Sequence, residues 1–217
     1  MSNGIIFKQM KTNYSQNNEQ EFIRKYFKDF TGCFLDIGAN DGKTLSNTYA
    51  LALRGWIGVC IEPSPKAYKK LCETYKMFDW VDTYNFAIGT KSGKLPFYES
   101  GEHAPKVYGE NVALLSSLQK SETYRFPDED FEKIEVDCLT WKDVVLNHIE
   151  DTDFDMISID AEGMDWAILK QMDLSYCKLL CIEWNGEQVT KHNIINYCLD
   201  FGLNMEYSNG ENIILTR

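Results

Sequence analysis

Short apolar segments alternate with longer amphipathic segments along most of this chain. Five apolar segments have the length of a strand, and they cover residues 33–38, 56–62, 81–88, 154–160 and 178–184. Segments with helical periodicity lie near residues 43–54, 65–77, 140–148, 163–172 and 189–201. This alternation is typical of a parallel sheet with helices on both faces, and it predicts an α/β fold of the Rossmann-like kind.

The end of the chain follows a different pattern. The short alternating runs LNMEYS and ENIILTR flank Asn209-Gly210, which is a strong signal for a two-residue hairpin turn. The mostly parallel sheet is therefore expected to close with a C-terminal antiparallel hairpin strand.

A polar segment at residues 100–130 interrupts the alternation and is too long for an ordinary connection. We expect an inserted loop or mobile lid there, anchored by two additional strands in the flanking runs KLPFYES and FEKIEVDCL. The predicted organisation is an N-terminal helical extension at 1–30 followed by one domain at 31–217.

Composition excludes several classes of protein. The net charge of −11 opposes a broad phosphate-binding surface, so nucleic acid is not the expected partner. No apolar run approaches the roughly 18 to 20 residues that cross a bilayer, and the start of the chain lacks a signal-peptide pattern. Together with seven cysteines that lack the spacing of a zinc site, this predicts a soluble, cytoplasmic protein without a membrane partner.

The first predicted strand leads into a turn of small residues. Asp36, Gly38, Ala39, Asn40 and Gly42 follow the spacing DxGxxxG, and a helix is expected to open near residue 43. Small side chains let a ligand approach the backbone, and the amides of a helix N-terminus attract a carboxylate. The pattern favours a cofactor site, although a tight strand-to-helix connection would look the same.

Two later strand ends add residues suited to a nucleoside. Glu62 lies 20 residues beyond Gly42, the distance at which an acid reaches ribose hydroxyls in Rossmann folds, and Pro63 could face the adenine. Asn85 and Ala87 are expected to read the base edge and leave room for it. A solvated strand end is the alternative for each.

Three acids are expected at the ends of the fourth and fifth strands. Asp160 and Glu162 would share one face if the strand continued, and Glu183 ends the next strand. They could position a substrate hydroxyl, act as a general base or hold a divalent ion. Glu162 could instead cap the following helix, and His103 in the long loop is a second candidate base.

With these motifs in place, the chain resembles the FkbM family of S-adenosylmethionine-dependent methyltransferases over about residues 14–216. The matching segments are SQNNEQEF, FLDIGANDGKTLSNT, GWIGVCIEPSP, NFAIG and ISIDAEGMDWAIL. The resemblance implies a class I methyltransferase fold and methyl transfer from S-adenosylmethionine, usually to oxygen. Ser158 departs from the lysine that the family often has at this position.

The expected function is O-methylation of a small polar or glycan hydroxyl, with Asp160, Glu162 and His103 as catalytic candidates. No bound metal is expected, and the oligomeric state is left open. The residues expected to bind S-adenosylmethionine are Asp36, Gly38, Ala39, Asn40, Gly42, Ser46, Glu62, Pro63, Asn85 and Ala87.

Two other functions fit a Rossmann-like site: a nicotinamide-dependent oxidoreductase and a non-catalytic nucleotide-binding module. The DxGxxxG spacing and the terminal hairpin argue against the first. The acids beside the turn argue against the second.

Overall fold

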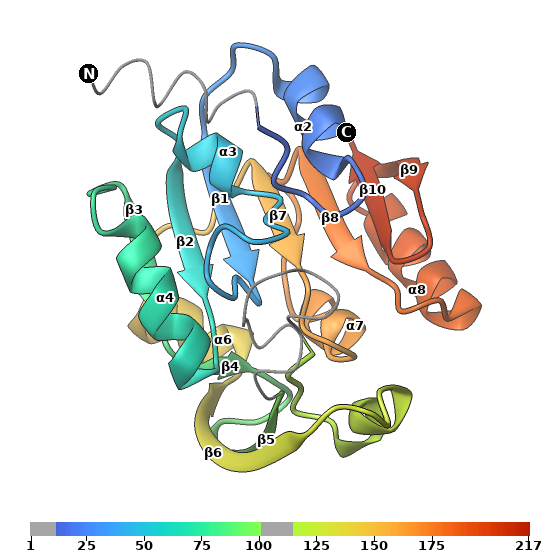
Figure 1. The fold of residues 1–217 in the computed structure, drawn as a ribbon. Coiled ribbons are helices and arrows are strands. Elements are labelled where there is room, and N and C mark those ends of the chain that lie inside the picture. The colour runs from blue at the N-terminus through green and yellow to red at the C-terminus, as the bar shows by residue number, and fades with distance from the viewer. Residues whose placement is uncertain (1–11, 101–114) are drawn as a thin grey trace.

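The computed structural model describes residues 12–100 and 115–217 (Figure 1). Its centre is a seven-stranded sheet with the order β3-β2-β1-β7-β8-β10-β9. These strands are β1 (Cys33–Ile37), β2 (Ile57–Ile61), β3 (Val81–Tyr84), β7 (Met156–Ile159), β8 (Leu179–Glu183), β9 (Asn204–Ser208) and β10 (Asn212–Thr216). The predicted α/β fold is confirmed.

The strand directions confirm the predicted ending of the sheet. β1 is parallel to both β2 and β7, whereas β10 is antiparallel to β8 and β9. β10 therefore lies inside the sheet and is buried along its whole length.

Helices cover both faces of this sheet because neighbouring strand residues point to opposite sides. Phe34 packs in one core with residues of α2 and α4, and Leu35 packs in the other with residues of α6, α7 and α8. The helices are α2 (Glu19–Phe27), α3 (Tyr49–Ala52), α4 (Pro65–Tyr75), α6 (Trp141–Asn147), α7 (Asp165–Leu169) and α8 (Gln188–Leu199).

The starts of two helices follow from local sequence. The Ser64 hydroxyl accepts a hydrogen bond from the Ala67 amide, and Pro65 has the fixed φ that suits a first helical position. Thr140 caps α6 in the same way through the Asp143 amide.

The helix predicted at 43–54 is wrong for most of its length, since α3 covers Tyr49–Ala52 alone. The Asp41 carboxylate accepts hydrogen bonds from the Lys43 and Thr44 amides, and the Ser46 hydroxyl accepts from the Tyr49 amide. Such local side-chain bonds compete with helical hydrogen bonds. Residues 43–48 are consequently an irregular segment.

The strand predicted at 81–88 is divided. β3 belongs to the central sheet, whereas β4 (Ala87–Ile88) belongs to a second sheet with the order β4-β6-β5. The other members, β5 (Gly93–Ser100) and β6 (Phe131–Leu139), pair antiparallel and confirm the two predicted additional strands. They flank the short 3-10 helix η1 (Lys120–Arg125).

The N-terminal helix is tied to the C-terminal hairpin by one buried carboxylate. Glu19, which is 0% exposed, accepts hydrogen bonds from the Asn17 amide and from the side-chain amides of Asn209 and Asn212. α2 and the red hairpin therefore lie side by side in Figure 1. The domain boundary at residue 30 stays a prediction, and residues 1–11 lie outside the described part.

Candidate active site

A tight turn follows β1 at the carboxyl edge of the sheet. The amides of Gly38 and Ala39 both donate to the Ile61 carbonyl, and Asn40 adopts a positive φ of 50°. Gly38 has a φ of 83°, and a Cβ there would lie 1.7 Å from the carbonyl oxygen of Asp160. Glycine is required at this position because two loops of the protein touch, and Gly38 also lines the cavity, so its predicted contact with a ligand stays a prediction.

Glu62 joins this turn to the end of β2. Its carboxylate accepts hydrogen bonds from the Asn40 amide at 2.8 Å and from the Ser64 amide at 2.7 Å. Burial raises the pKa of Glu62 to about 7, against the lowering effect of these two bonds. Each carboxylate oxygen still has acceptor capacity for a hydroxyl group.

A cavity of about 350 Å³ opens beside both turns. This volume falls within the range of about 300 to 1,000 Å³ for small-molecule sites. The side-chain oxygen of Asn40 is buried there and has no hydrogen-bond partner within the described residues, so it can accept a bond from a ligand. The predicted site residues that line the cavity are Asp36, Gly38, Ala39, Asn40, Ser46, Glu62, Pro63, Ala87, Asp160 and Glu162.

Two predicted cofactor residues do not line the cavity. A Cβ on Gly42 would lie 2.6 Å from the Tyr75 ring, so this glycine makes room for a core side chain. The side-chain amide of Asn85 donates to the backbone carbonyls of Glu62 and Pro63 and holds that turn. Both residues are explained by contacts inside the protein, and their predicted contacts with the cofactor stay predictions.

Two further predicted residues have partners inside the protein as well. The Asp36 carboxylate accepts a hydrogen bond from the Thr48 hydroxyl at 2.6 Å, and burial raises the pKa of Asp36 to about 6. The Ser46 hydroxyl accepts hydrogen bonds from the backbone amides of Thr48 and Tyr49.

Asp160, Glu162 and Glu183 form an acidic cluster at the far side of the cavity. One carboxylate oxygen from each lies within 4.8 Å of the others. β7 ends at Ile159, so the acids do not share a strand face as predicted, and a turn with Glu162 at a φ of 44° brings them together instead. Asp160 is open to the cavity, whereas Glu183 is only 8% exposed.

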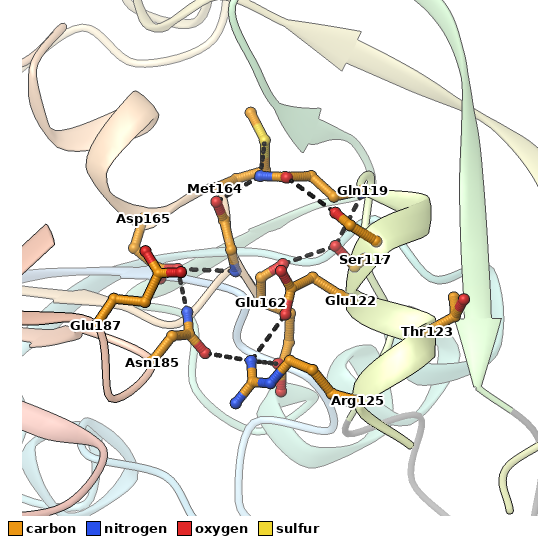
Figure 2. A network of polar contacts seen from close by, with 12 residues as sticks. Ser117, Gln119, Glu122, Thr123, Arg125, Glu162, Met164, Asp165, Asn185 and Glu187 are labelled. Atoms are coloured by element: carbon orange, nitrogen blue, oxygen red, sulfur yellow. Dashed lines mark hydrogen bonds and ion pairs between the residues drawn. The ribbon is translucent and has the colours of Figure 1, made fainter. Parts of the chain in front are cut away.

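A fourth acid, Asp165, builds that turn (Figure 2). Its carboxylate accepts hydrogen bonds from the Ala161 amide at 2.8 Å and the Gly163 amide at 3.0 Å. Asp165 thus holds the turn before α7, and neither it nor Glu162 supplies a side-chain cap hydrogen bond to that helix. Sequence reasoning missed this residue, because its bonds reach back to amides two and four residues earlier and no motif spacing pointed to them.

The acids of the cluster hold protons strongly. Although Asp160 faces the open cavity, desolvation by the surrounding protein atoms, with repulsion from Asp165 and other acids, raises its pKa to about 8. Burial and the charge of Asp160 raise the pKa of Glu183 to about 11, and the same causes raise the pKa of Glu162 well above its usual range. Close carboxylates in a low-dielectric site cannot all ionise unless a cation joins them.

The described part of the polar insertion packs on this turn. The Ser117 hydroxyl donates to the Glu162 carbonyl at 2.6 Å, and the Gln119 side chain donates to the Gly163 carbonyl at 2.5 Å. Arg125 contacts both Glu122 and Asn185, as Figure 2 shows. Residues 115–125 are thus docked rather than free, while residues 101–114, including the candidate base His103, lie outside the described part.

The family model for the FkbM methyltransferase domain matches residues 36–204 of the chain. The chain belongs to the FkbM methyltransferase family. It is therefore an S-adenosylmethionine-dependent methyltransferase, and S-adenosylmethionine is its cofactor. The oxidoreductase and the non-catalytic module considered from sequence are set aside. No sequence among the curated proteins matches the chain.

Several solved structures resemble this FkbM methyltransferase at 10% sequence identity. They include a precorrin-6y C5,15-methyltransferase from Geobacter metallireducens, with a TM-score of 0.47 and coverage of 95% of this chain and 91% of that one. A Pyrococcus horikoshii protein described as a candidate RNA methyltransferase has a TM-score of 0.48, with coverage of 100% and 99%. A TehB-like methyltransferase from Corynebacterium glutamicum has a TM-score of 0.45, with coverage of 100% and 95%. These likenesses say nothing about the acceptor.

Glu62→Ala is expected to weaken binding of S-adenosylhomocysteine, the demethylated cofactor, by about 10- to 100-fold. The change removes the carboxylate that is expected to accept from the ribose hydroxyls, and bonds to a charged group contribute about 1.5 to 3 kcal/mol. It also removes the acceptor of the Asn40 and Ser64 amides, which hold the two turns together. Isothermal titration calorimetry measures the affinity, with Glu73→Ala on the exposed face of α4 as the matched control. An unchanged affinity in a folded Glu62→Ala protein would remove Glu62 from the cofactor site.

Proposed function

We propose that this methyltransferase transfers a methyl group from S-adenosylmethionine to a hydroxyl oxygen of a small polar or carbohydrate acceptor. The observation that carries the proposal is that the β1 turn, Glu62 and the acidic cluster line one cavity. A cofactor and a hydroxyl group can therefore meet beside a carboxylate that accepts protons readily.

The roles follow from the position of each group. Asn40 and Glu62 offer acceptors on the β1 and β2 side, where they would bind the donor groups of the cofactor. When bound, S-adenosylmethionine supplies an electrophilic methyl group on its sulfonium sulfur. Asp160 faces the cavity from the β7 side and would take the hydroxyl proton, since a neutral alcohol is a poor nucleophile. Holding the two groups in line supplies much of the remaining rate.

A small acceptor is favoured by size and by charge. A cavity of about 350 Å³ lies near the lower end of the range for small-molecule sites and would also hold the cofactor, which favours a small acceptor or one hydroxyl-bearing end of a larger molecule. The net charge of −11 disfavours a nucleic-acid acceptor.

Two further expectations accompany this function. We place the enzyme in the cytoplasm, because an odd number of cysteines suits a reducing compartment. We also treat residues 31–217 as the catalytic domain. Within the described residues, no helix is long and apolar enough to cross a membrane.

Methyl-labelled S-adenosylmethionine offered with a panel of acceptors is expected to label a monosaccharide, oligosaccharide or sugar nucleotide. The panel also contains single-stranded RNA, a carboxylic acid and a primary amine, so that each acceptor class competes under the same conditions. The product is then treated with mild alkali, because a methyl ether survives and a methyl ester does not. Label in RNA, on nitrogen or in an alkali-labile product would overturn the proposal.

A further inference from the structure

The three acids of the cluster have the separation that one metal ion requires. The carboxylate oxygens of Asp160, Glu162 and Glu183 all lie within 4.8 Å of one another. Ligands on opposite sides of Ca²⁺ are about 4.6 to 5.2 Å apart, because each metal–oxygen distance is about 2.3 to 2.6 Å. One ion can thus touch all three oxygens, and a slight approach of the side chains would suit the smaller Mn²⁺ or Mg²⁺.

Glu183 supplies an independent indication of a ligand. Its Oε2 atom is buried and has no hydrogen-bond partner in the described part of the chain, and the residue is 8% exposed and lines the cavity. A buried carboxylate oxygen without a donor is costly, so native proteins leave few of them. A cation in the cluster would satisfy this atom.

Among the described residues, Arg125 is the cation that lies near the cluster, and it balances only part of the charge that three ionised acids would carry. Glu122 forms an ion pair with Arg125 at 2.8 Å, and Asp165 is bonded to backbone amides. Arg125 comes no closer than 4.0 Å to Glu162, and its side chain is 41% exposed. A divalent ion would displace the protons of these acids and balance two of the three charges of the ionised carboxylates.

We propose that Asp160, Glu162 and Glu183 bind one hard divalent cation, with its open side toward the cavity. Metal-free catalysis was the expectation from sequence, and the geometry favours the ion-assisted alternative. Cation binding does not depend on the proposed function. Only its role rests on O-methylation. The ion would bind the acceptor hydroxyl and lower its pKa, and water in the open cavity, rather than Asp160, would then take the proton.

The test uses the complete chain after treatment with a chelator, and Mn²⁺ as the probe. Electron paramagnetic resonance of free Mn²⁺ is expected to show one ion bound per chain. Glu183→Gln and Glu162→Gln should each weaken Mn²⁺ binding by about tenfold or more. Mutation of a residue that only hydrogen-bonds to a metal ligand already lowers metal affinity by about that factor. The matched control Glu73→Gln, an exposed acid on α4, should bind Mn²⁺ like the unaltered protein.

Two results would overturn the metal site. One is absence of stoichiometric Mn²⁺ binding, or binding that both Gln variants retain. The other is that Glu183→Gln leaves Mn²⁺ affinity unchanged and weakens the positively charged S-adenosylmethionine more than the neutral S-adenosylhomocysteine. The acids would then interact with the positively charged sulfonium group of the cofactor instead of a metal ion.

Failure of the metal site and failure of the proposed function have different signatures. Methyl transfer to a hydroxyl that persists in chelator-treated protein would remove the catalytic role of the ion and leave O-methylation intact. Mn²⁺ binding without any hydroxyl methylation would contradict the proposed function and leave the metal site intact.

Discussion

Asp160→Asn should lower the rate of methyl transfer by about 100-fold or more, while S-adenosylhomocysteine still binds. The amide keeps the size of the carboxylate, but it cannot accept the hydroxyl proton and is a poorer metal ligand. Proton transfer by a positioned side chain contributes about 10²- to 10⁴-fold. The loss is therefore expected whether Asp160 acts as the base or through a cation.

Single-turnover kinetics with an acceptor identified from the panel measure this rate, and calorimetry measures cofactor affinity. Asp79→Asn, in the exposed turn between α4 and β3, is the matched control and should behave like the unaltered enzyme. Near-normal turnover in Asp160→Asn would exclude this residue from the mechanism.

The same variant has a second signature in thermal stability. The pKa of Asp160 is raised to about 8, so between roughly pH 4 and pH 8 the folded chain keeps a proton that the unfolded chain has lost. The contribution of this acid to stability falls as pH rises through that window. Asparagine does not titrate, so the Tm advantage of ligand-free Asp160→Asn should be larger at pH 8 than at pH 5.5.

Gly38→Ala should destabilise the fold by about 3 kcal/mol or more and abolish cofactor binding. Two costs combine: the positive φ of 83°, and a Cβ that would lie 1.7 Å from the backbone oxygen of Asp160. Strain at a positive φ alone costs about 1 to 3 kcal/mol. The contact is with backbone, so relief requires the β1 and β7 loops to separate, and those loops carry both halves of the site.

Gly55→Ala separates the two costs. Gly55 has a φ of 84°, but a Cβ there meets no atom within 4 Å. It should lose only about 1 kcal/mol, near the lower end for strain alone. Urea unfolding measures both variants, and equal losses would show that contact with the Asp160 loop does not constrain Gly38.

Sequence patterns predicted those parts of the fold that depend on residues close together in the sequence. Alternating apolar runs gave the strands of the central sheet, and Asn209-Gly210 gave the hairpin, because each signal lies within a few residues. The helix predicted at 43–54 failed for a reason that is also local. Asp41 and Ser46 bond to nearby amides, and helical periodicity does not report such competition.

The candidate site was predictable in position but not in its internal contacts. Gly38 was singled out for a ligand, yet one constraint on it lies 122 residues further along the chain, in the carbonyl of Asp160. Likewise, the contact between Arg125 and Asn185 joins an insertion to a strand end far away in sequence. Periodicity and spacing carry no information on such pairs.

The link between Glu19 and the terminal hairpin sets the order in which the site can be completed during synthesis. Gln16 near the beginning of the described chain and Gly210 near its end line the same cavity, and β10 has to enter between β8 and β9. A nascent chain that has not yet released residues 209–212 from the ribosome holds the β1 turn, Glu62 and all three acids. Its Glu19 nevertheless lacks two of its three hydrogen-bond donors, and one wall of the cavity is missing. The cavity therefore gains this wall only when β9 and β10 are in place.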